Sequence, residues 1–472
     1  MKRTVNTLLF SSALLSSFLA VAEPPLPGGL GGDKPSASGP ALPSGLGLPG
    51  SADAEPTLPS GLGEDSTFSI STAEYSPFSL HGFVEARVGQ RTHDDELQRN
   101  TSIGEGRAQL SLDYAGEKVI ARITGDVLLD DVQRDESVQL DRGRGPVDLR
   151  EAWFQMPVNQ HLDVKAGRQI LTWGVGDLLF INDLFPKDWN SFFSGRDTEY
   201  LKAPSDAVKL AFYFEPANLD VVYVPEFDSD RFIDGRRISF YNPLIGDHSG
   251  RDMPVNPDFP HGRELALRLY RNLAGAEVAF YGYDGYWKSP NGYDPYKGQN
   301  TFPELRVWGA SLRGNMGKGI ASAEVGYYDS REDRNGDDPL ISNSESRLLL
   351  AYEQELVPNL TGALQYYVER LEDYDNYRDN LPTGMPQKDK YRQLLTSRLT
   401  WLTHNQNVTW SLFVYYSPTD KDWYARPKVS WKASDQLLLE TGINSFGGSE
   451  ETTFFGQFEE ASNFYAAIRY SF

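Results

Sequence analysis

The sequence predicts an all-β protein: a transmembrane, antiparallel, up-and-down β-barrel of about 18 strands, with about 16 as the alternative count. Three observations lead to this prediction. From residue 78 onward the chain alternates apolar and polar residues with a period of two. The connections between these segments are alternately short and long. Tyrosine and phenylalanine are abundant, at 25 each, and cysteine is absent.

The sequence divides into three predicted regions. Residues 1–22 are typical of a secretory signal peptide, since Lys2 and Arg3 precede a short apolar run and a small-residue cleavage site. Residues 23–77 are rich in Pro, Gly, Ser and Ala, a composition that does not bury a core, and they predict a disordered tail. Residues 78–472 form the predicted barrel domain.

Individual segments show the strand period clearly. In the first one, Leu80, Val84 and Val88 share one face, while Glu85 and Arg87 share the other. A period of two over eight or more residues indicates a strand and not a helix. About 18 such segments begin near residues 78, 106, 118, 148, 161, 206, 218, 263, 274, 304, 319, 345, 359, 392, 406, 422, 436 and 462.

The connections distinguish a barrel from a soluble sheet protein. Every second connection is short, as in A-G-E, P-V-N-Q and E-P-A-N. The connections between them are mostly long, and only residues 417–421 are brief in that set. This alternation is typical of transmembrane barrels, which have short turns on the periplasmic side and longer loops outside. The alternative, a periplasmic or extracellular β-sandwich, does not require it.

The width of the predicted barrel and the net charge of the chain restrict the possible functions. A barrel of about 18 strands is too wide for its wall side chains to fill, so it leaves an aqueous lumen through which a solute can pass. The formal net charge of −21 argues against nucleic acid as a partner. None of the six histidines falls in the middle of a predicted strand, which argues against a catalytic barrel. We expect no catalytic residue, no metal site and no cofactor.

Strand parity predicts which charged side chains face the lumen. Basic and acidic candidates nearly balance, so two interpretations stay open: arginine–carboxylate ladders that hold the wall together, or groups that guide a solute. The predicted pore-lining residues are Arg87, Arg107, Arg122, Glu151, Arg168, Arg268, Arg313, Arg347, Arg398, Arg426 and Arg469.

The connection at residues 173–205 is unusually apolar for a loop. Its leucines, phenylalanines and tryptophan require burial, and the lumen is the nearest cover. We expect it to fold inward and to narrow the pore, with Asp177, Asp183 and Asp188 nearby. The alternatives are packing on the outer rim and an oligomer contact.

Two short motifs carry a family resemblance. The segment L-R-E-A-W contains Arg150 to Trp153, and G-R-Q follows at Gly167, Arg168 and Gln169. This motif pair resembles alginate-export-type channels and other porin-like barrels of Gram-negative bacteria. The C-terminal Phe472 is similar to the aromatic last residue of bacterial outer-membrane barrels. The resemblance implies an outer-membrane channel for a polymer or a small organic acid.

The motif also creates a conflict with strand parity. Simple alternation points Arg168 and Arg150 at lipid, where an arginine near the midplane costs about 2–4 kcal/mol. A β-bulge at Gly167 would turn Arg168 into the lumen, beside the inward loop. We therefore predict a bulge there.

The predicted tail repeats one phrase, L-P-x-G-L-G, three times. The tail precedes a strand that starts in the periplasm, so the copies would lie there, below a barrel surrounded by outer-membrane lipid and lipopolysaccharide. Three weak ligands on one tether raise avidity, so the repeats could dock a periplasmic or inner-membrane transport component. The alternative is a duplicated spacer. The candidate binding residues are Leu26, Leu30, Leu42, Leu46, Leu58 and Leu62.

Overall fold

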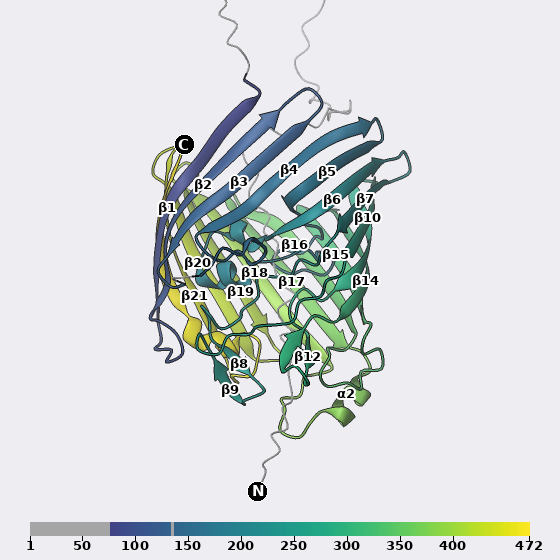
Figure 1. Ribbon diagram of the computed structural model, residues 1–472. Coiled ribbons are helices and arrows are strands. Elements are labelled where there is room, and N and C mark those ends of the chain that lie inside the picture. The colour runs from purple at the N-terminus through teal and green to yellow at the C-terminus, as the bar shows by residue number, and fades with distance from the viewer. Residues whose placement is uncertain (1–75, 134–135) are drawn as a thin grey trace, which may run out of the picture. The chain divides into compact units, whose positions relative to one another are not determined.

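The computed structural model describes residues 76–133 and 136–472. The predicted signal peptide, nearly all of the predicted tail and all six repeat leucines lie outside the described residues. The C-terminal strand β22 pairs with β1 along Phe83–Arg91, and this pairing closes the sheet into a barrel (Figure 1). The closed, 18-stranded, antiparallel barrel confirms the predicted fold class.

The barrel strands follow one another in chain order, and each pairs with its sequence neighbours. They are β1 (Phe78–Arg91), β2 (Thr101–Ala115), β3 (Ile120–Asp130), β4 (Val147–Asn159), β5 (Leu162–Ile170), β6 (Pro204–Tyr213), β7 (Asn218–Val224), β10 (Glu264–Leu273), β11 (Ala276–Tyr286), β14 (Glu304–Met316), β15 (Gly319–Ser330), β16 (Glu345–Val357), β17 (Leu360–Leu371), β18 (Tyr391–Thr403), β19 (Val408–Ser417), β20 (Asp422–Lys432), β21 (Leu437–Gly448) and β22 (Asn463–Ser471).

Short elements occupy the long loops. They are η2 (Leu140–Arg142), α1 (Trp189–Ser194), η3 (Thr198–Leu201), β8 (Phe240–Asn242), β9 (Asp247–Ser249), β12 (Gly292–Asp294), β13 (Gln299–Thr301), α2 (Tyr374–Asn380) and η4 (Gly456–Ala461). No helix in the described part of the chain is both long and apolar enough to span a membrane.

The strand starts agree closely with the sequence pattern. The exception is β2, which begins at Thr101 and not near residue 106, whereas every other strand begins within two residues of its predicted start. Gly104 and Gly106 interrupt the apolar alternation there, yet Ile103 is fully buried and pairs with Gly89 of β1. Pairing with β1 therefore extends the strand beyond its sequence pattern.

Turns and loops separate to opposite ends of the barrel. The short turns lie at the upper end in Figure 1, called the turn end below, and the long loops lie at the lower, loop end. The turn between β10 and β11 has two residues, Ala274 and Gly275, with φ angles of 51° and 85°. Positive φ at both positions is what the tightest hairpin turns require.

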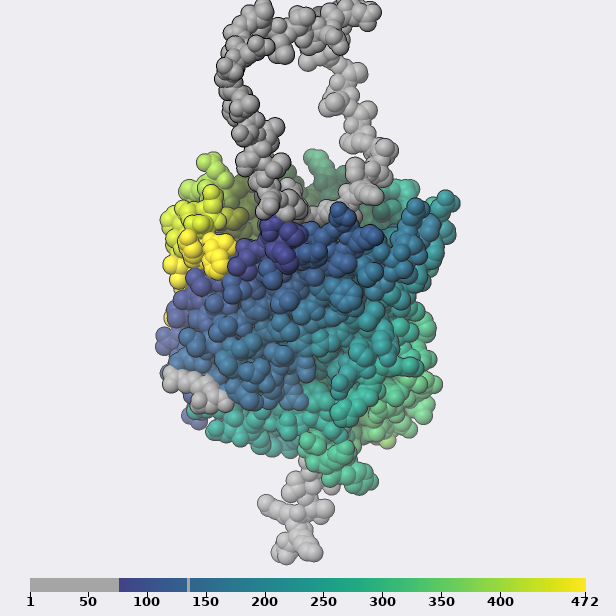
Figure 2. Space-filling view, turned by 45° about the horizontal axis from the view of Figure 1, so that its top comes forward, coloured from purple at the N-terminus to yellow at the C-terminus, as the bar shows by residue number. Residues whose placement is uncertain are grey.

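Alternation places apolar side chains on the outer wall. Leu80 and Leu129 are 65% and 75% exposed, and Trp401 and Phe472 are about half exposed. Figure 2 shows an unbroken outer wall over the N-terminal strands, drawn in purple and blue. The buried core lies instead inside the barrel, where the connection between β5 and β6 packs against the inward side chains of the strands.

Candidate functional site

The connection between β5 and β6, residues 171–203, crosses the inside of the barrel and is called the lumen loop below. The backbone N–H groups of Val175 and Gly176 donate to the carboxylate of Glu324 on β15, at 3.0 and 3.2 Å. At its other end, Arg87 of β1 donates to the carbonyl of Gly195, at 2.6 Å. β15 and β1 are far apart around the barrel, so the loop spans the lumen.

The apolar side chains of the lumen loop are buried against the wall. Leu179, Ile181 and Trp189 have no exposed surface, and Phe193 packs edge-on against Tyr424 of β20, with ring centroids 5.4 Å apart. This burial is the cover that the apolar composition of the loop requires.

A short helix shapes the second half of the loop. Asp188 caps α1, since its carboxylate accepts from the backbone N–H of Ser191 at 2.7 Å. Gly195 ends the helix with φ of 87°, a conformation that glycine adopts without steric cost. A Cβ at Gly195 would also lie 2.4 Å from the ring of Tyr465.

The three aspartates singled out in this loop differ in their contacts. Asp177 forms an ion pair with Arg398 of β18 at 2.7 Å, and this contact ties the loop to the barrel wall. Asp183 pairs with Lys187 of the same loop at 3.0 Å. Besides capping α1, Asp188 lies 3.4 Å from Arg231 of the loop that follows β7. Of the three, only Asp177 pairs with an inward arginine of a barrel strand.

Glu324 of β15 holds the lumen loop in place, although nothing in the sequence marks it for this role. Besides the two N–H groups already named, its carboxylate accepts from the backbone N–H and the side-chain amide of Asn182, at 2.8 and 2.9 Å. Parity places Glu324 inward, but the lumen loop that meets it is about 140 residues earlier in the chain. No local pattern marks that contact.

Several predicted pore-lining arginines pair with carboxylates of the same strand, of nearby strands or of the lumen loop. Arg87 contacts Glu85 and Glu440 at 3.0 and 2.9 Å, and its side chain is almost fully buried. Arg469 lies 2.8 Å from Glu85 and 3.1 Å from Asp197 of the lumen loop. These contacts agree with the ladder interpretation for this part of the wall, and they also tie the loop to it.

Two further arginines combine ion pairs with aromatic rings. Arg107 pairs with Asp126 and lies 4.1 Å above the ring of Tyr200 in the lumen loop. Arg347 lies 2.5 Å from Glu345 and 3.9 Å above the ring of Tyr328. Arginine over an aromatic face is favourable where water is excluded.

The remaining predicted residues have fewer partners. Arg122 pairs with Asp113 at 2.6 Å and lies 3.7 Å from Glu151, and Arg268 pairs with Glu277 at 2.7 Å. Arg426 has no carboxylate within 4.0 Å in the described residues and lies 3.9 Å above the ring of Phe192 in the lumen loop.

Arg313 also has no ion pair among the described residues. It stands on β14 close to the turn end, opposite Ser322 of β15 and Glu277 of β11, and it is partly exposed.

The predicted bulge at Gly167 is wrong. Gly167 has φ of 117°, but its pairing is regular on both sides, with Trp153 of β4 and Ala207 of β6. The irregularity lies in β4, where Arg150 is skipped between the partners of Thr124 and Gly125. The extra residue turns Arg150 inward, and it donates to the carbonyl of Lys202 in the lumen loop at 2.7 Å.

Without a bulge at Gly167, Arg168 does not line the pore. It pairs with Asp206 of β6, whose neighbour on the same face, Val208, is exposed on the outer wall. Arg168 contacts Asp206 and Asp141 of the loop after β3, both at 2.6 Å. Asp206 within β6 and Asp141 in the loop neutralise the charge of Arg168 on the outer side, so Arg168 does not need to turn inward.

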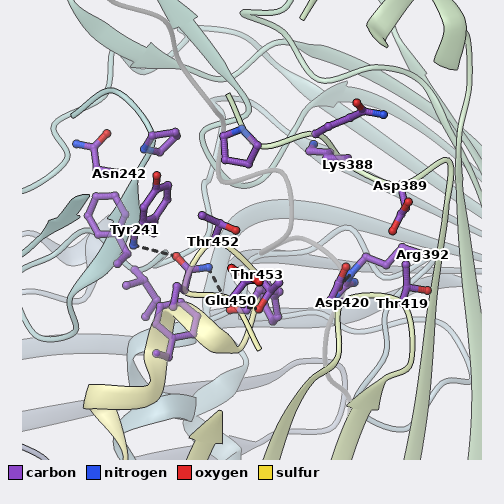
Figure 3. A pocket seen from close by; sticks show the side chains of 18 of the residues that line it. Tyr241, Asn242, Lys388, Asp389, Arg392, Thr419, Asp420, Glu450, Thr452 and Thr453 are labelled. Carbon is purple, nitrogen blue, oxygen red and sulfur yellow. Dashed lines mark hydrogen bonds and ion pairs between the residues drawn. The ribbon is translucent and has the colours of Figure 1, made fainter. Parts of the chain in front are cut away.

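Two cavities lie toward opposite ends of the described barrel. The larger, about 430 Å³, lies at the loop end. Figure 3 shows Tyr241 and Asn242 on one of its sides and Lys388, Asp389 and Arg392 on the other. The smaller, about 280 Å³, lies at the turn end between the inward faces of β4, β5 and β6 and the first residues of the lumen loop. Residues of the lumen loop line the smaller cavity, and none of them lines the larger one.

Comparison with protein-family models finds no match, and comparison with curated proteins finds none either. Solved structures do match. The OccK10 (OpdN) and OccD3 (OpdP) structures of Pseudomonas aeruginosa each give a TM-score of 0.48, at 12% and 9% identity, and cover 84% of this chain and 99% and 91% of theirs. OccAB4 of Acinetobacter baumannii gives a TM-score of 0.52 at 10% identity, covering 84% of this chain and 98% of that chain. At this identity the likeness concerns the fold alone, and the chain therefore has the barrel fold of the Gram-negative outer-membrane porin OccAB4.

Proposed function

We propose that the protein is an outer-membrane channel that passes a small solute through the barrel, with the lumen loop narrowing the path. The observation that carries this proposal is a closed barrel with a loop anchored across its lumen and a cavity toward each end. An outer wall of exposed leucine, valine and tryptophan side chains supports a membrane location.

The size of the cavities favours a small solute over a polymer. Volumes of about 430 and 280 Å³ match sites for single small molecules. The lumen loop is anchored to opposite walls by Glu324 and Arg87. A polymer would require that loop to leave the lumen, which would break these contacts. No catalytic step is part of the proposal.

The even strand number puts both ends of the barrel domain at the turn end, which would face the periplasm. In the second proposal, the L-P-x-G-L-G repeats dock a periplasmic or inner-membrane component, and the barrel is the outer part of an export route. Only the sequence repeat supports this idea, and its test is a deletion, given in the Discussion.

Conductance of the purified protein in a planar bilayer tests the channel proposal. We expect discrete current steps, with solute flux into liposomes that falls as solute size increases. The control is the same preparation unfolded by heat, checked by its altered mobility in gels. Folded protein that inserts into the bilayer and carries no current would contradict the proposal.

A further inference from the structure

The cavity at the turn end has an unusual pair of charges on its wall. Lys165 of β5 and Lys209 of β6 line it and stand directly opposite each other in the antiparallel ladder. Side chains in such a pair have Cβ atoms about 5 Å apart, and like charges placed there repel. A partly buried pair of this kind is more stable if each ammonium group finds a counter-charge.

Only one of the two lysines has an acidic partner. Lys209 pairs with Asp220 of β7 at 3.0 Å. Lys165 has no carboxylate oxygen within 4.0 Å among the described residues, and its Nζ lies 3.8 Å above the ring of Trp153. The indole face attracts the ammonium group but leaves its N–H donors without an anionic acceptor.

The acidic groups nearest to Lys165 have other partners. Asp163 lines the same cavity and accepts from the hydroxyl of Tyr213 at 3.3 Å. Glu151 accepts from the Trp153 indole N–H at 2.8 Å and lies 3.7 Å from Arg122. The positive charge of Lys165 is thus the one on this wall that faces the cavity without an ion pair.

A buried acceptor, four residues along β5 from Lys165, lines the same cavity. Gln169 is fully buried, and its side-chain amide N–H groups donate to the carbonyls of Gly167 and Ala207, at 3.2 and 2.9 Å. Its Oε1 has no donor in the described residues. A buried acceptor without a donor is costly, so a ligand that fits here brings a donor.

We propose that this cavity binds a small oxyanion that also carries a hydrogen-bond donor, such as a hydroxycarboxylate or hydrogen phosphate. The oxyanion accepts from Lys165 and Lys209 and relieves their repulsion, and its hydroxyl group donates to Gln169. Leu171 and Trp173 of the lumen loop close the cavity on the loop side. The binding site stands by itself, whereas its role as a station on the transport path rests on the proposed channel function.

Calorimetric titration of the folded protein in detergent tests the site, with matched ligands. Lactate and propionate differ by the hydroxyl group, and hydrogen phosphate and sulfate differ by the donor. We expect lactate to bind at least about fivefold tighter than propionate, and phosphate to bind tighter than sulfate by a similar factor. Equal binding within both pairs would overturn the role of Gln169, and no binding by any of the four would overturn the site.

Two variants separate the site from a general effect of charge. Lys165→Gln removes the unpaired cation, and Arg313→Gln removes another inward cation at the turn end, on a different part of the wall. We expect K165Q to weaken lactate binding about tenfold or more and R313Q to leave it unchanged. Equal binding by K165Q and the unsubstituted protein would overturn the proposal.

Binding and transport are measured separately, so the two proposals fail separately. Lactate binding without conductance would contradict the proposed channel function but not the proposed oxyanion site. Conductance without oxyanion binding would contradict the proposed oxyanion site but not the proposed channel function. If K165Q does not fold, the matched ligands on the unsubstituted protein still decide.

Discussion

Glu324 and Asn182 meet inside the barrel through two hydrogen bonds, one from the backbone N–H and one from the side-chain amide of Asn182, at 2.8 and 2.9 Å. Through this contact β15 holds the middle of the lumen loop. Since the loop crosses the lumen, we expect its anchoring to influence how wide the path through the barrel is.

Replacing Glu324 with alanine should release this part of the lumen loop. Three backbone N–H groups and one amide would lose their acceptor, at about 1–3 kcal/mol. We expect larger and noisier single-channel currents than in the unsubstituted protein. Glu353→Ala is the control, because Glu353 is an inward acid on the next strand that accepts no hydrogen bond from the loop among the described residues. Identical currents in E324A and the unsubstituted protein would show that the anchor does not control the path.

Arg398 and Arg168 provide a test of which arginine lines the pore. Arg398 faces the lumen and pairs with Asp177 at 2.7 Å, whereas Arg168 pairs with Asp206 and Asp141 on the outer side. We expect Arg398→Gln to reduce the permeability of chloride relative to potassium, measured as a shift of the reversal potential in a salt gradient. Arg168→Gln should leave that potential unchanged. A shift of equal size in R168Q would mean that Arg168 lines the pore after all.

Arg87 should be among the most important residues for stability. It is almost fully buried and pairs with Glu85 and Glu440, so Arg87→Met leaves two buried carboxylates without it. We expect a loss of about 3 kcal/mol in the free energy of unfolding, measured by urea titration in detergent. Arg378→Met, on the exposed helix α2, is the control and should change it by less than about 0.5 kcal/mol. A loss as small as that of the control would mean that the other contacts of Glu85 and Glu440 suffice.

Asp228, in the loop that follows β7, should make stability depend on pH. Burial raises the pKa of its carboxyl from 3.8 to about 7, while Lys288 acts to lower it and Glu264 to raise it. The folded state therefore holds this proton more tightly than the unfolded state, so stability falls as the pH rises from about 4 to about 7. At a pH of about 8, Asp228→Asn should be more stable than the unsubstituted protein by about 1–2 kcal/mol.

The same comparison at a pH of about 4 should show almost no difference, since the carboxyl is then largely protonated in the folded state. Asp252→Asn, at an exposed position of the same loop, is the control for the effect of an Asp-to-Asn change in this loop. Urea titrations at the two pH values provide the measurement. A gain for D228N that is the same at both values would point to packing and not to titration.

The repeat-bearing segment offers a test of the export proposal. The docking hypothesis predicts that deleting residues 24–64 abolishes solute transport in whole cells and leaves the conductance of the purified barrel unchanged. A variant with the same segment length and composition but with the six repeat leucines changed to serine controls for tether length. Unchanged transport in both variants would favour the spacer interpretation.

Strand positions followed from the sequence because the period of two and the length of a turn are local properties. The alternation around Glu85 and Arg87 indicated both the strand and its inward face, and the short connections indicated turns between adjacent strands. The strand β2 shows the limit of this approach, since pairing with β1 extended it through two glycines.

The sequence by itself determined the barrel, the turn and loop ends, and the need of the 173–205 segment for burial, since apolar side chains in a loop require burial wherever they lie. The tertiary structure decided which residues meet. Parity did not distinguish a bulge at Gly167 from one at Arg150, because that choice depends on register with the neighbouring strands. Two further contacts arise only when distant segments are brought together: Glu324 with Asn182, and Lys165 opposite Lys209. No periodicity in the sequence encodes either of them.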